Sequence, residues 1–259
     1  MDRDVFDLSG RVAVVTGGSS GIGKGIAAAL GRFGARVVIG GRDAAKCERA
    51  RAELDGLGVP ALAVPGDISE AGRAEALVGA AVEAWGRVDV LVNSAGVSQG
   101  VPALEMTPEE WRRVVAVDLD GAFYCSQAAA RRMVERGAGG AIVNVTSLSG
   151  LLGYADQAAY CAAKGGLTML TRALAVEWAR HQIRVNAIAP TWFYTPIAAH
   201  VLDDPGRLRE KLASIPLGRV GQVEDVDGAV VFLASRASAF VTGQVLCIDG
   251  GKLALLGES

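Results

Sequence analysis

The sequence predicts an α/β protein with a Rossmann-like, doubly wound parallel sheet of about seven strands. Short apolar runs such as VAVVT and AIVNV are typical of strands buried on both faces of a parallel sheet. Longer segments rich in Ala, Leu, Glu and Arg separate these runs, as crossover helices do. No low-complexity linker divides the chain, so we expect one dinucleotide-binding and catalytic domain over residues 1–259.

The expected elements alternate along the whole chain. Strands are expected at 11–16, 36–40, 61–65, 88–93, 141–147, 183–189 and 244–249. Helices are expected at 23–33, 43–54, 70–85, 108–136 and 157–180. Residues 191–216 interrupt this pattern with several prolines and an aromatic patch. Because the segment follows the sixth strand, we expect it to form a substrate flap of one or two short helices over the ligand-binding edge of the sheet.

Composition narrows the classes of partner. Of the 259 residues, 51% are hydrophobic, which is ample for a large core, and the net charge of −2 favours neither nucleic acid nor a membrane surface. No apolar stretch reaches the length of a membrane span or a signal peptide. The scattered cysteines indicate reduced thiols in a cytoplasmic protein, and the histidines lie in no metal-binding motif, so no metal is expected. These residues are Cys47, Cys125, Cys161, Cys247, His181 and His200.

A glycine-rich turn lies between the first strand and the first helix. Gly17, Gly21 and Gly23 allow a positive φ and a close approach of a pyrophosphate to the backbone, and the helix N-terminus favours the phosphate charge. A phosphate-binding P-loop is the rival interpretation, but that motif requires Ser or Thr where the chain has Gly25. The turn therefore predicts a dinucleotide site.

The end of the second strand bears on the choice of dinucleotide. An acidic residue there would bind the adenosine ribose, but the chain has Gly41 followed by Arg42, which can pair with a 2′-phosphate. NADP(H) is therefore favoured over NAD(H). Asp43 could still accept from the ribose, although an N-cap of the next helix is the better interpretation.

Tyr160 and Lys164 are four residues apart on an expected helix, so they share one face. We expect the ammonium to lower the pKa of the phenol, which then serves as the acid/base of an alcohol–ketone interconversion. Ser147, at the end of the fifth strand, would orient the substrate oxygen. The sequence thus predicts hydride transfer between nicotinamide and a carbonyl or alcohol.

With these motifs the chain closely resembles the short-chain dehydrogenase/reductase family over nearly its whole length. The matching stretches are TGGSSGIG, NSAG, IVNVTS, YCAAK, IRVNAIAP and VTGQVLCIDGG. The resemblance implies a homotetramer and a catalytic centre at Ser147, Tyr160 and Lys164, with the last two also binding the cofactor. It further implies cofactor contacts at Gly17, Ser19, Ser20, Gly21, Ile22, Gly23, Asp67, Ile68, Asn93, Ala95, Gly96, Pro190 and Thr195.

Three positions depart from the family pattern. Asp118 stands where the family often has an asparagine that helps to relay protons to the lysine, and we count it with the catalytic residues. Thr191 replaces a glycine below the flap, and Ser94 replaces a frequent asparagine. Asp118 changes the charge near Lys164, whereas Thr191 affects the flap and Ser94 affects a loop.

The expected substrate contacts are Ser149, Tyr154, Gln157, Trp192 and Tyr194. This polar and aromatic wall suits a polyol or sugar acid, as in the gluconate 5-dehydrogenase-like branch. A 3-oxoacyl-carrier-protein reductase is the alternative, for which an arginine patch at residues 131–136 could dock the acidic carrier. A non-catalytic dinucleotide-binding sensor or scaffold is the second alternative, although such proteins usually lose the tyrosine or the lysine.

Overall fold

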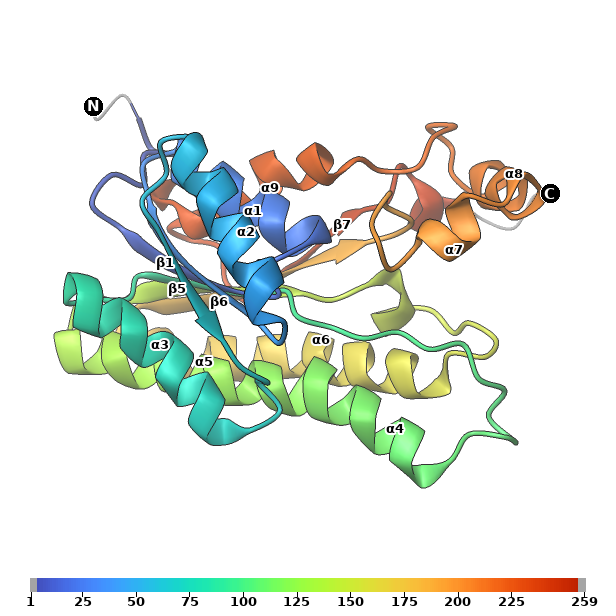
Figure 1. Cartoon of the computed structure of the whole chain (residues 1–259), viewed down its shortest axis with the longest axis horizontal. Helices are drawn as coiled ribbons and strands as arrows, with labels where there is room; N and C mark the ends of the chain where they lie inside the picture. The colour runs from blue at the N-terminus through green and yellow to red at the C-terminus, as the bar shows by residue number, and fades with distance from the viewer. Residues whose placement is uncertain (1–3, 256–259) are drawn as a thin grey trace.

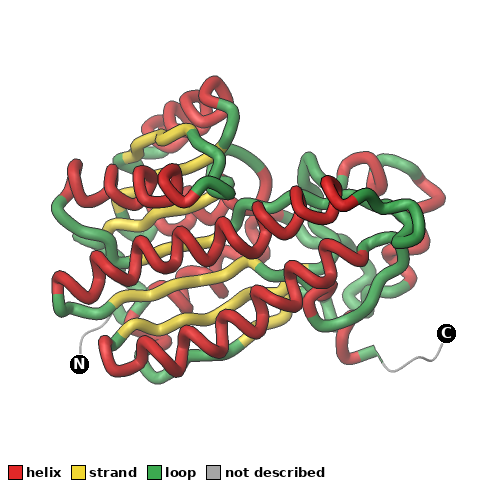
Figure 2. The backbone as a smooth tube through the Cα atoms, turned by 90° about the horizontal axis from the view of Figure 1, so that it is seen from below, coloured by secondary structure: helices red, strands yellow, loops and turns green. Residues whose placement is uncertain are grey.

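The computed structural model describes residues 4–255 of the chain. They contain one parallel seven-stranded sheet in the order β3-β2-β1-β4-β5-β6-β7 (Figures 1 and 2), so the expected fold class is confirmed. Each expected strand is present, with its ends displaced by no more than two residues. The strands are β1 (Val12–Thr16), β2 (Arg36–Gly41), β3 (Ala61–Pro65), β4 (Val90–Asn93), β5 (Gly140–Val145), β6 (Ile183–Pro190) and β7 (Val245–Ile248).

The strand order reverses between β1 and β4. The chain runs outward from β1 to β2 and β3, then returns to place β4 on the other side of β1. Thr16 and Asn93, the last residues of these two strands, are paired in register. The loops that leave them diverge, and in open α/β sheets such a switch point is where ligands bind.

Helices cover both faces of the sheet (Figure 1). One layer buries Ile26 and Leu30 of α1 together with Val230 of α9, and the other buries Leu77 of α3 and Met133 of α5. Helix α9 was not among the expected helices. The helices are α1 (Gly21–Arg32), α2 (Ala44–Gly56), α3 (Ala71–Trp85), α4 (Pro108–Val115), α5 (Gly121–Arg136), α6 (Ala158–Trp178), α7 (Ala199–Leu202), α8 (Pro205–Ala213) and α9 (Asp227–Ala234).

Two departures from regular structure concern the site. The helix expected at 108–136 is divided by a π-helical turn, Ala116–Asp120, between α4 and α5. Residues 191–216 carry the short helices α7 and α8, and α8 begins with Asp204 capping the backbone N–H of Arg207. Within the described part of the chain, no helix is long and apolar enough to cross a membrane.

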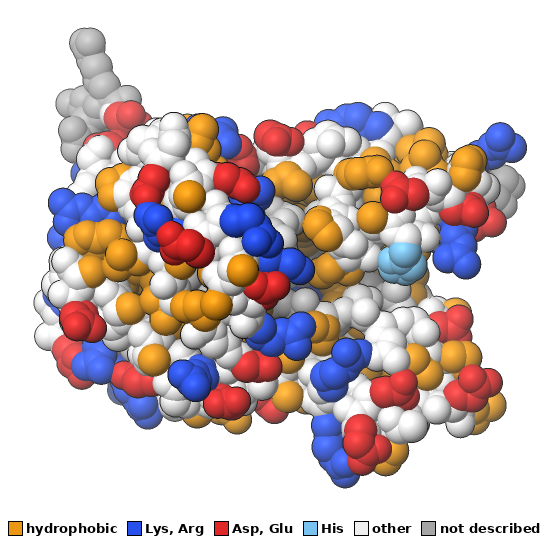
Figure 3. Space-filling view, viewed as in Figure 1, with side chains coloured by type: hydrophobic (Ala, Val, Ile, Leu, Met, Phe, Trp, Pro, Cys, Tyr) orange, Lys and Arg blue, Asp and Glu red, His pale blue; other side chains and the backbone are white. Residues whose placement is uncertain are grey.

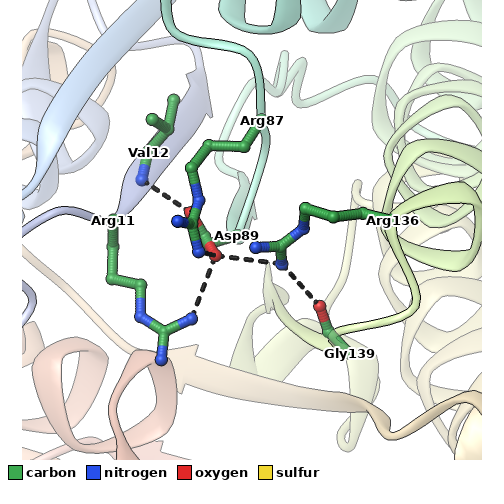
Figure 4. Close-up of polar contacts among 6 residues, drawn as sticks. All are labelled: Arg11, Val12, Arg87, Asp89, Arg136 and Gly139. Atoms are coloured by element: carbon green, nitrogen blue, oxygen red, sulfur yellow. Dashed lines mark hydrogen bonds and ion pairs between the residues drawn. The ribbon is translucent and has the colours of Figure 1, made fainter.

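The amino edge of the sheet contains a buried carboxylate among three arginines (Figure 4). Asp89, just before β4, accepts hydrogen bonds from the Val12 N–H at 3.0 Å, Arg11 at 3.0 Å and Arg87 at 2.7 Å. Arg136, the last residue of α5, forms an ion pair with it at 3.0 Å. The cluster joins two strands and a helix at the edge opposite the switch point.

Candidate active site

A cavity of about 460 Å³ opens at the carboxyl edge of the sheet. Loops after β1, β4, β5 and β6 line it together with the segment that carries α7. In the space-filling view, the molecule is hollowed between the part with α7 and α8 and the part with the β4–α4 connection (Figure 3). The expected site residues in its wall are Gly17, Ser20, Gly21, Ile22, Gly23, Ala95, Gly96, Ser147, Ser149, Tyr154, Gln157, Tyr160, Lys164, Pro190, Trp192 and Thr195.

The turn after β1 leaves room for a ligand because its glycines have no side chains. Gly17 has φ +66°, and a Cβ there would lie 2.8 Å from the Ala95 Cα. A Cβ on Gly23 would lie 2.4 Å from the Gly17 carbonyl oxygen. Ser20 precedes α1 without capping it through its side chain, so the first N–H groups of the helix are available to a ligand. This cradle fits the pyrophosphate of a dinucleotide.

One hydroxyl fixes the loop after β4 to the end of β1. The Thr16 Oγ1 accepts hydrogen bonds from the backbone N–H groups of Ser94 and Ala95, each at 3.0 Å. The two loops that border the switch point are thereby held together. Gly21 faces the flap segment on the other side, where the side chain of Thr195 would lie 3.6 Å from an added Cβ.

Several expected adenosine contacts lie around the end of β2, outside the cavity wall. Arg42 is exposed and forms no ion pair with any described residue, whereas Asp43 caps α2 by accepting from the Lys46 N–H at 2.9 Å. The N-cap interpretation of Asp43 is therefore confirmed. Asp67 accepts from the Ser69 hydroxyl at 2.8 Å.

Two further expected contacts flank this region. Ser19 lies beside Gly41, where an added Cβ would come within 2.7 Å of its hydroxyl oxygen. Ile68 is buried, and its side chain would meet a Cβ on Gly121 at 2.9 Å. Ser19 therefore lies where β2 ends, and Ile68 packs against the start of α5.

The side chain of Asn93 is engaged inside the protein. It was expected along the cofactor, but it is buried and donates to the Ser126 hydroxyl at 2.9 Å and to the Asn144 side-chain oxygen at 2.8 Å. Asn144 in turn donates to Thr171. The amide nitrogen thus belongs to a network that joins β4, β5, α5 and α6, whereas the Asn93 Oδ1 is buried with no hydrogen-bond partner in the described part of the chain.

Helix α6 and the end of β5 bring the expected catalytic residues together. The Lys164 Nζ lies 5.6 Å from the centroid of the Tyr160 ring and donates to the Val145 carbonyl at 3.1 Å. The Ser147 hydroxyl lies close enough to the phenol to lower the pKa of Tyr160. Both hydroxyls lie in the cavity wall, and Lys164 lies behind them with 4% of its surface exposed.

The electrostatics of this group differ from the expectation. Burial raises the pKa of Tyr160, and this effect and the nearby Asp118 carboxylate outweigh the lowering by Lys164 and Ser147. The pKa of Lys164 is raised, because Asp118 and Tyr160 together outweigh the burial that disfavours its charge. The expectation of a lowered Tyr160 pKa is therefore wrong for the protein without cofactor, because the pKa is raised overall. Lys164 itself lowers the pKa, as expected.

Asp118 lies on the π-helical turn beside Lys164. Its Oδ2 is 3.2 Å from the Lys164 Nζ, and its Oδ1 accepts from the Val97 N–H at 2.7 Å. A Cβ on Gly96 would lie 2.8 Å from the Asp118 Oδ2, so glycine at 96 makes room for the carboxylate. Burial raises the pKa of Asp118 despite its neighbouring ammonium.

Polar groups continue along the substrate side of the cavity. The Ser147 hydroxyl accepts from the Ser149 N–H at 3.1 Å, and the Ser149 hydroxyl donates to the Gln157 side-chain oxygen at 3.2 Å. His200, which was not among the expected contacts, also lines the cavity, and its Nδ1 lies 2.9 Å from the Ile197 carbonyl oxygen. No motif marks His200, because only the fold of α7 brings it to the cavity.

The aromatic part of the wall divides into two groups. Tyr154 and Trp192 line the cavity, and the ammonium groups of Lys252 and Lys211 lie 5.6 Å and 5.1 Å from their respective ring centroids. Tyr194, by contrast, is 50% exposed and is not among the residues that line the cavity; its hydroxyl donates to Asp203. Tyr194 thus holds the flap segment together, which the aromatic composition of the segment did not predict.

Two of the three arginines considered for carrier-protein docking are paired within the chain. Arg132 forms ion pairs with Glu75 and Glu135, and Arg136 pairs with Asp89 at the amino edge of the sheet. These arginines lie at the end of α5 that is remote from the cavity. They therefore give no support to a docking surface beside the site.

Comparison with known proteins identifies the family of this chain. The family model described as enoyl-(acyl carrier protein) reductase matches residues 17–252. The chain is 44% identical over 253 residues to galactitol 2-dehydrogenase (L-tagatose-forming) of Cereibacter sphaeroides, covering 96% of this chain and 97% of that protein. It is 38% identical over 248 residues to gluconate 5-dehydrogenase of Gluconobacter oxydans (strain 621H), covering 96% of each.

A solved structure shows the same architecture. The gluconate 5-dehydrogenase of Burkholderia cenocepacia J2315, crystallised in complex with NADP and tartrate, superposes with a TM-score of 0.93 at 36% identity, covering 98% of this chain and 99% of that one. The protein belongs to the short-chain dehydrogenase/reductase family. It is an oxidoreductase that uses a nicotinamide dinucleotide and acts on a small molecule.

Proposed function

We propose that this protein interconverts a secondary alcohol and a ketone of a sugar acid or polyol with NADP(H) as its cofactor. The observation that carries the proposal is that Ser147 and Tyr160 both lie in the cavity wall, with the Lys164 ammonium 5.6 Å from the centroid of the phenol ring. A substrate oxygen can meet both hydroxyls at once, which the reaction requires.

Each residue then has a defined role. Ser147 donates to the substrate oxygen and holds it, while Tyr160 removes the alcohol proton during oxidation and returns it during reduction. The Lys164 ammonium stabilises the phenolate that forms, because it is the nearest positive charge. When bound, the nicotinamide supplies the hydride donor or acceptor and, in its oxidised form, a positive charge. The cradle formed by Gly17, Gly23 and the first N–H groups of α1 holds the pyrophosphate.

The preference for NADP(H) is proposed from Arg42. Its guanidinium is exposed at the end of β2 and is not paired with a described carboxylate, so it can bind a 2′-phosphate. Asp43, the residue that could have bound the ribose instead, is engaged at the start of α2. The Burkholderia cenocepacia relative is bound to NADP, which is consistent with this preference.

The substrate class is proposed from the wall of the cavity. Serine and glutamine side chains suit hydroxyl groups, and Lys211 and Lys252, which lie over the Trp192 and Tyr154 rings of the cavity wall, add positive charge near the cavity that favours an acidic substrate. The relatives named above act on galactitol and gluconate, a polyol and a sugar acid. Residues 191–216 serve as the substrate flap. We further propose that the protein is a cytoplasmic homotetramer, as the family resemblance implies.

The test is a Tyr160→Phe variant assayed with NADPH against keto-sugar acids, ketoses and β-ketoacyl thioesters. Loss of the phenolic proton should lower kcat by about 10²- to 10⁴-fold. NADPH should still raise the melting temperature, since the cradle is intact. Tyr124→Phe is the matched control, because Tyr124 lies outside the cavity wall.

Parental turnover by Tyr160→Phe would reject the mechanism. Preferred turnover of β-ketoacyl thioesters would favour the carrier-protein reductase, and NADPH binding without turnover of any substrate would favour a sensor or scaffold. Equal turnover with NADH and NADPH would reject the proposed cofactor preference.

A further inference from the structure

Asp118 is the most deeply buried charged group at the site, with none of its surface exposed. Its two carboxylate oxygens have different partners. Oδ1 accepts from the Val97 N–H, in the loop that lines the cavity after β4, and Oδ2 faces the Lys164 ammonium at 3.2 Å. A single side chain therefore connects the cavity wall to the residue behind the phenol.

An amide would not make the same two contacts. Asparagine could accept from Val97 through its oxygen, but its NH₂ group would then face the Lys164 ammonium, donor against donor. The surroundings fit a carboxylate instead. The π-helical turn brings Asp118 to this place, and Gly96 leaves the space beside Oδ2 free, where a Cβ would lie 2.8 Å away.

The charge count shows what the carboxylate changes. The titratable groups that face one another here are Tyr160, Cys161 and Lys164 from α6 and Asp118 from the π-helical turn. Ser147 and Val145, from the end of β5, contribute neutral groups. Before any proton is released, the phenol and the thiol are neutral, Lys164 carries one positive charge and Asp118 one negative charge. The group then has no net charge. Release of the first proton therefore leaves a net charge of minus one.

With a neutral residue at position 118, the same group begins at a net charge of plus one and becomes neutral. A net negative charge is harder to create in a buried site, so the carboxylate moves release of the first proton to a higher pH. This holds whether that proton leaves Tyr160 or Lys164, because the two groups titrate together.

We propose that Asp118 is a positioning residue that serves as the fixed counter-charge of Lys164 and so sets the pH at which the Tyr160–Lys164 pair releases its first proton. The inference rests on the proposed function, in which that proton comes from the acid/base of the reaction. According to this inference, Asp118 controls the pH dependence of the reaction, which an asparagine at the same position would not do.

The main test compares Asp118→Asn with the parent enzyme in alcohol oxidation. The acidic limb of the kcat/KM profile, which reports formation of the base, should move to lower pH by about one to three pH units. Asp118→Glu should restore the limb toward its original position, because it restores the charge. Asp120→Asn is the matched control: it removes a carboxylate from the same turn, and no hydrogen bond or ion pair in the described part of the chain joins Asp120 to Tyr160 or Lys164.

A second readout needs neither substrate nor cofactor. The near-ultraviolet absorbance of tyrosinate is titrated in the parent and in Asp118→Asn, and the matching titrations with Tyr160→Phe are subtracted to isolate Tyr160. Its ionisation should begin at a lower pH in the Asp118→Asn background. Asp118→Ser, whose hydroxyl can still accept from Val97, is the second neutral variant should Asp118→Asn not fold.

An unchanged limb together with an unchanged tyrosinate titration would overturn the inference, as would an equal shift in Asp120→Asn. Failure of the proposed function has a different signature. In that case Tyr160→Phe keeps its turnover, while the tyrosinate titration still reports whether Asp118 controls the charge of this group.

Discussion

Two buried carboxylates, one at each edge of the sheet, have pKa values that are shifted in opposite directions. Asp89 is 3% exposed at the amino edge and contacts three arginines and a backbone N–H (Figure 4), whereas Asp118 is fully buried at the carboxyl edge and contacts one lysine and one backbone N–H. Burial opposes ionisation at both. At Asp89 the donors outweigh burial and the pKa is lowered, but at Asp118 burial outweighs its partners and the pKa is raised.

The comparison indicates that, for these two buried carboxylates, the number of donors decides whether the effect of burial on the pKa is overcome. Asp89 has enough donors to remain ionised and can only stabilise the fold, since it lies far from the cavity. Asp118 has few donors and lies beside the proposed catalytic pair, where its carboxylate faces the Lys164 ammonium. We therefore expect changes at the amino edge to alter stability and changes at the carboxyl edge to alter function.

The largest effect is expected from Asp89→Ala. Three arginines would lose their shared partner, and breaking a buried pair on one side costs about 3–5 kcal/mol. Urea unfolding should show that loss in the free energy of unfolding, while kcat per folded molecule stays at the parental value. A stability loss below about 1 kcal/mol, or a selective loss of kcat, would contradict the division between the two edges.

The same variant has a pH signature. Because the pKa of Asp89 is lowered in the folded state, its contribution is present above the unfolded value of about 3.9 and is lost as the pH falls through the folded value. The stability difference between parent and variant should therefore shrink in acid. Asp120→Asn, with no contact to this cluster, serves as the control.

A smaller effect, on function alone, is expected from Arg42→Met at the carboxyl edge. A hydrogen bond to a charged group is worth about 1.5–3 kcal/mol, so KM for NADPH should rise by about tenfold or more while KM for NADH changes little. The melting temperature without cofactor should stay constant, because Arg42 forms no ion pair with a described residue. Lys46→Met removes a neighbouring exposed charge and controls for a general electrostatic effect. Equal weakening of both cofactors would remove Arg42 from 2′-phosphate recognition.

The smallest effect is expected from Gly79→Ala in α3, remote from both clusters. A Cβ there meets nothing within 4 Å, so the variant should gain about 0.5–1 kcal/mol through better helix propensity. Gly23→Ala is its counterpart in the cradle, where the added Cβ would lie 2.4 Å from a carbonyl oxygen. NADPH should stabilise Gly79→Ala as it does the parent, but should stabilise Gly23→Ala far less. Equal stabilisation would show that the turn after β1 does not hold the cofactor.

The strands could be predicted from the sequence because each is a short apolar run between breakers. Helix α9, Asp227–Ala234, was missed because its sequence, DGAVVFLA, is apolar on nearly every side and has no helical period. The π-helical turn was missed for another reason. It inserts into a continuous helical pattern, and only the packing of α4 and α5 against their neighbours reveals where the register changes.

The candidate site was predictable where its residues form contiguous motifs, as in the glycine turn and the Tyr160–Lys164 pair. Contacts between distant segments were not. The Asn93 amide finds its partners on α5 and β5, Tyr194 pairs with Asp203, and His200 reaches the cavity only through α7. The net pKa of Tyr160 also depends on burial, which a motif does not encode.

The cradle after β1 has a consequence for redesign. Because Gly17 and Gly23 leave no space for a Cβ, even one added methyl group at either position would meet neighbouring backbone atoms. If Arg42 binds the cofactor as proposed, a change of cofactor preference is therefore better sought around Arg42 than at these two glycines.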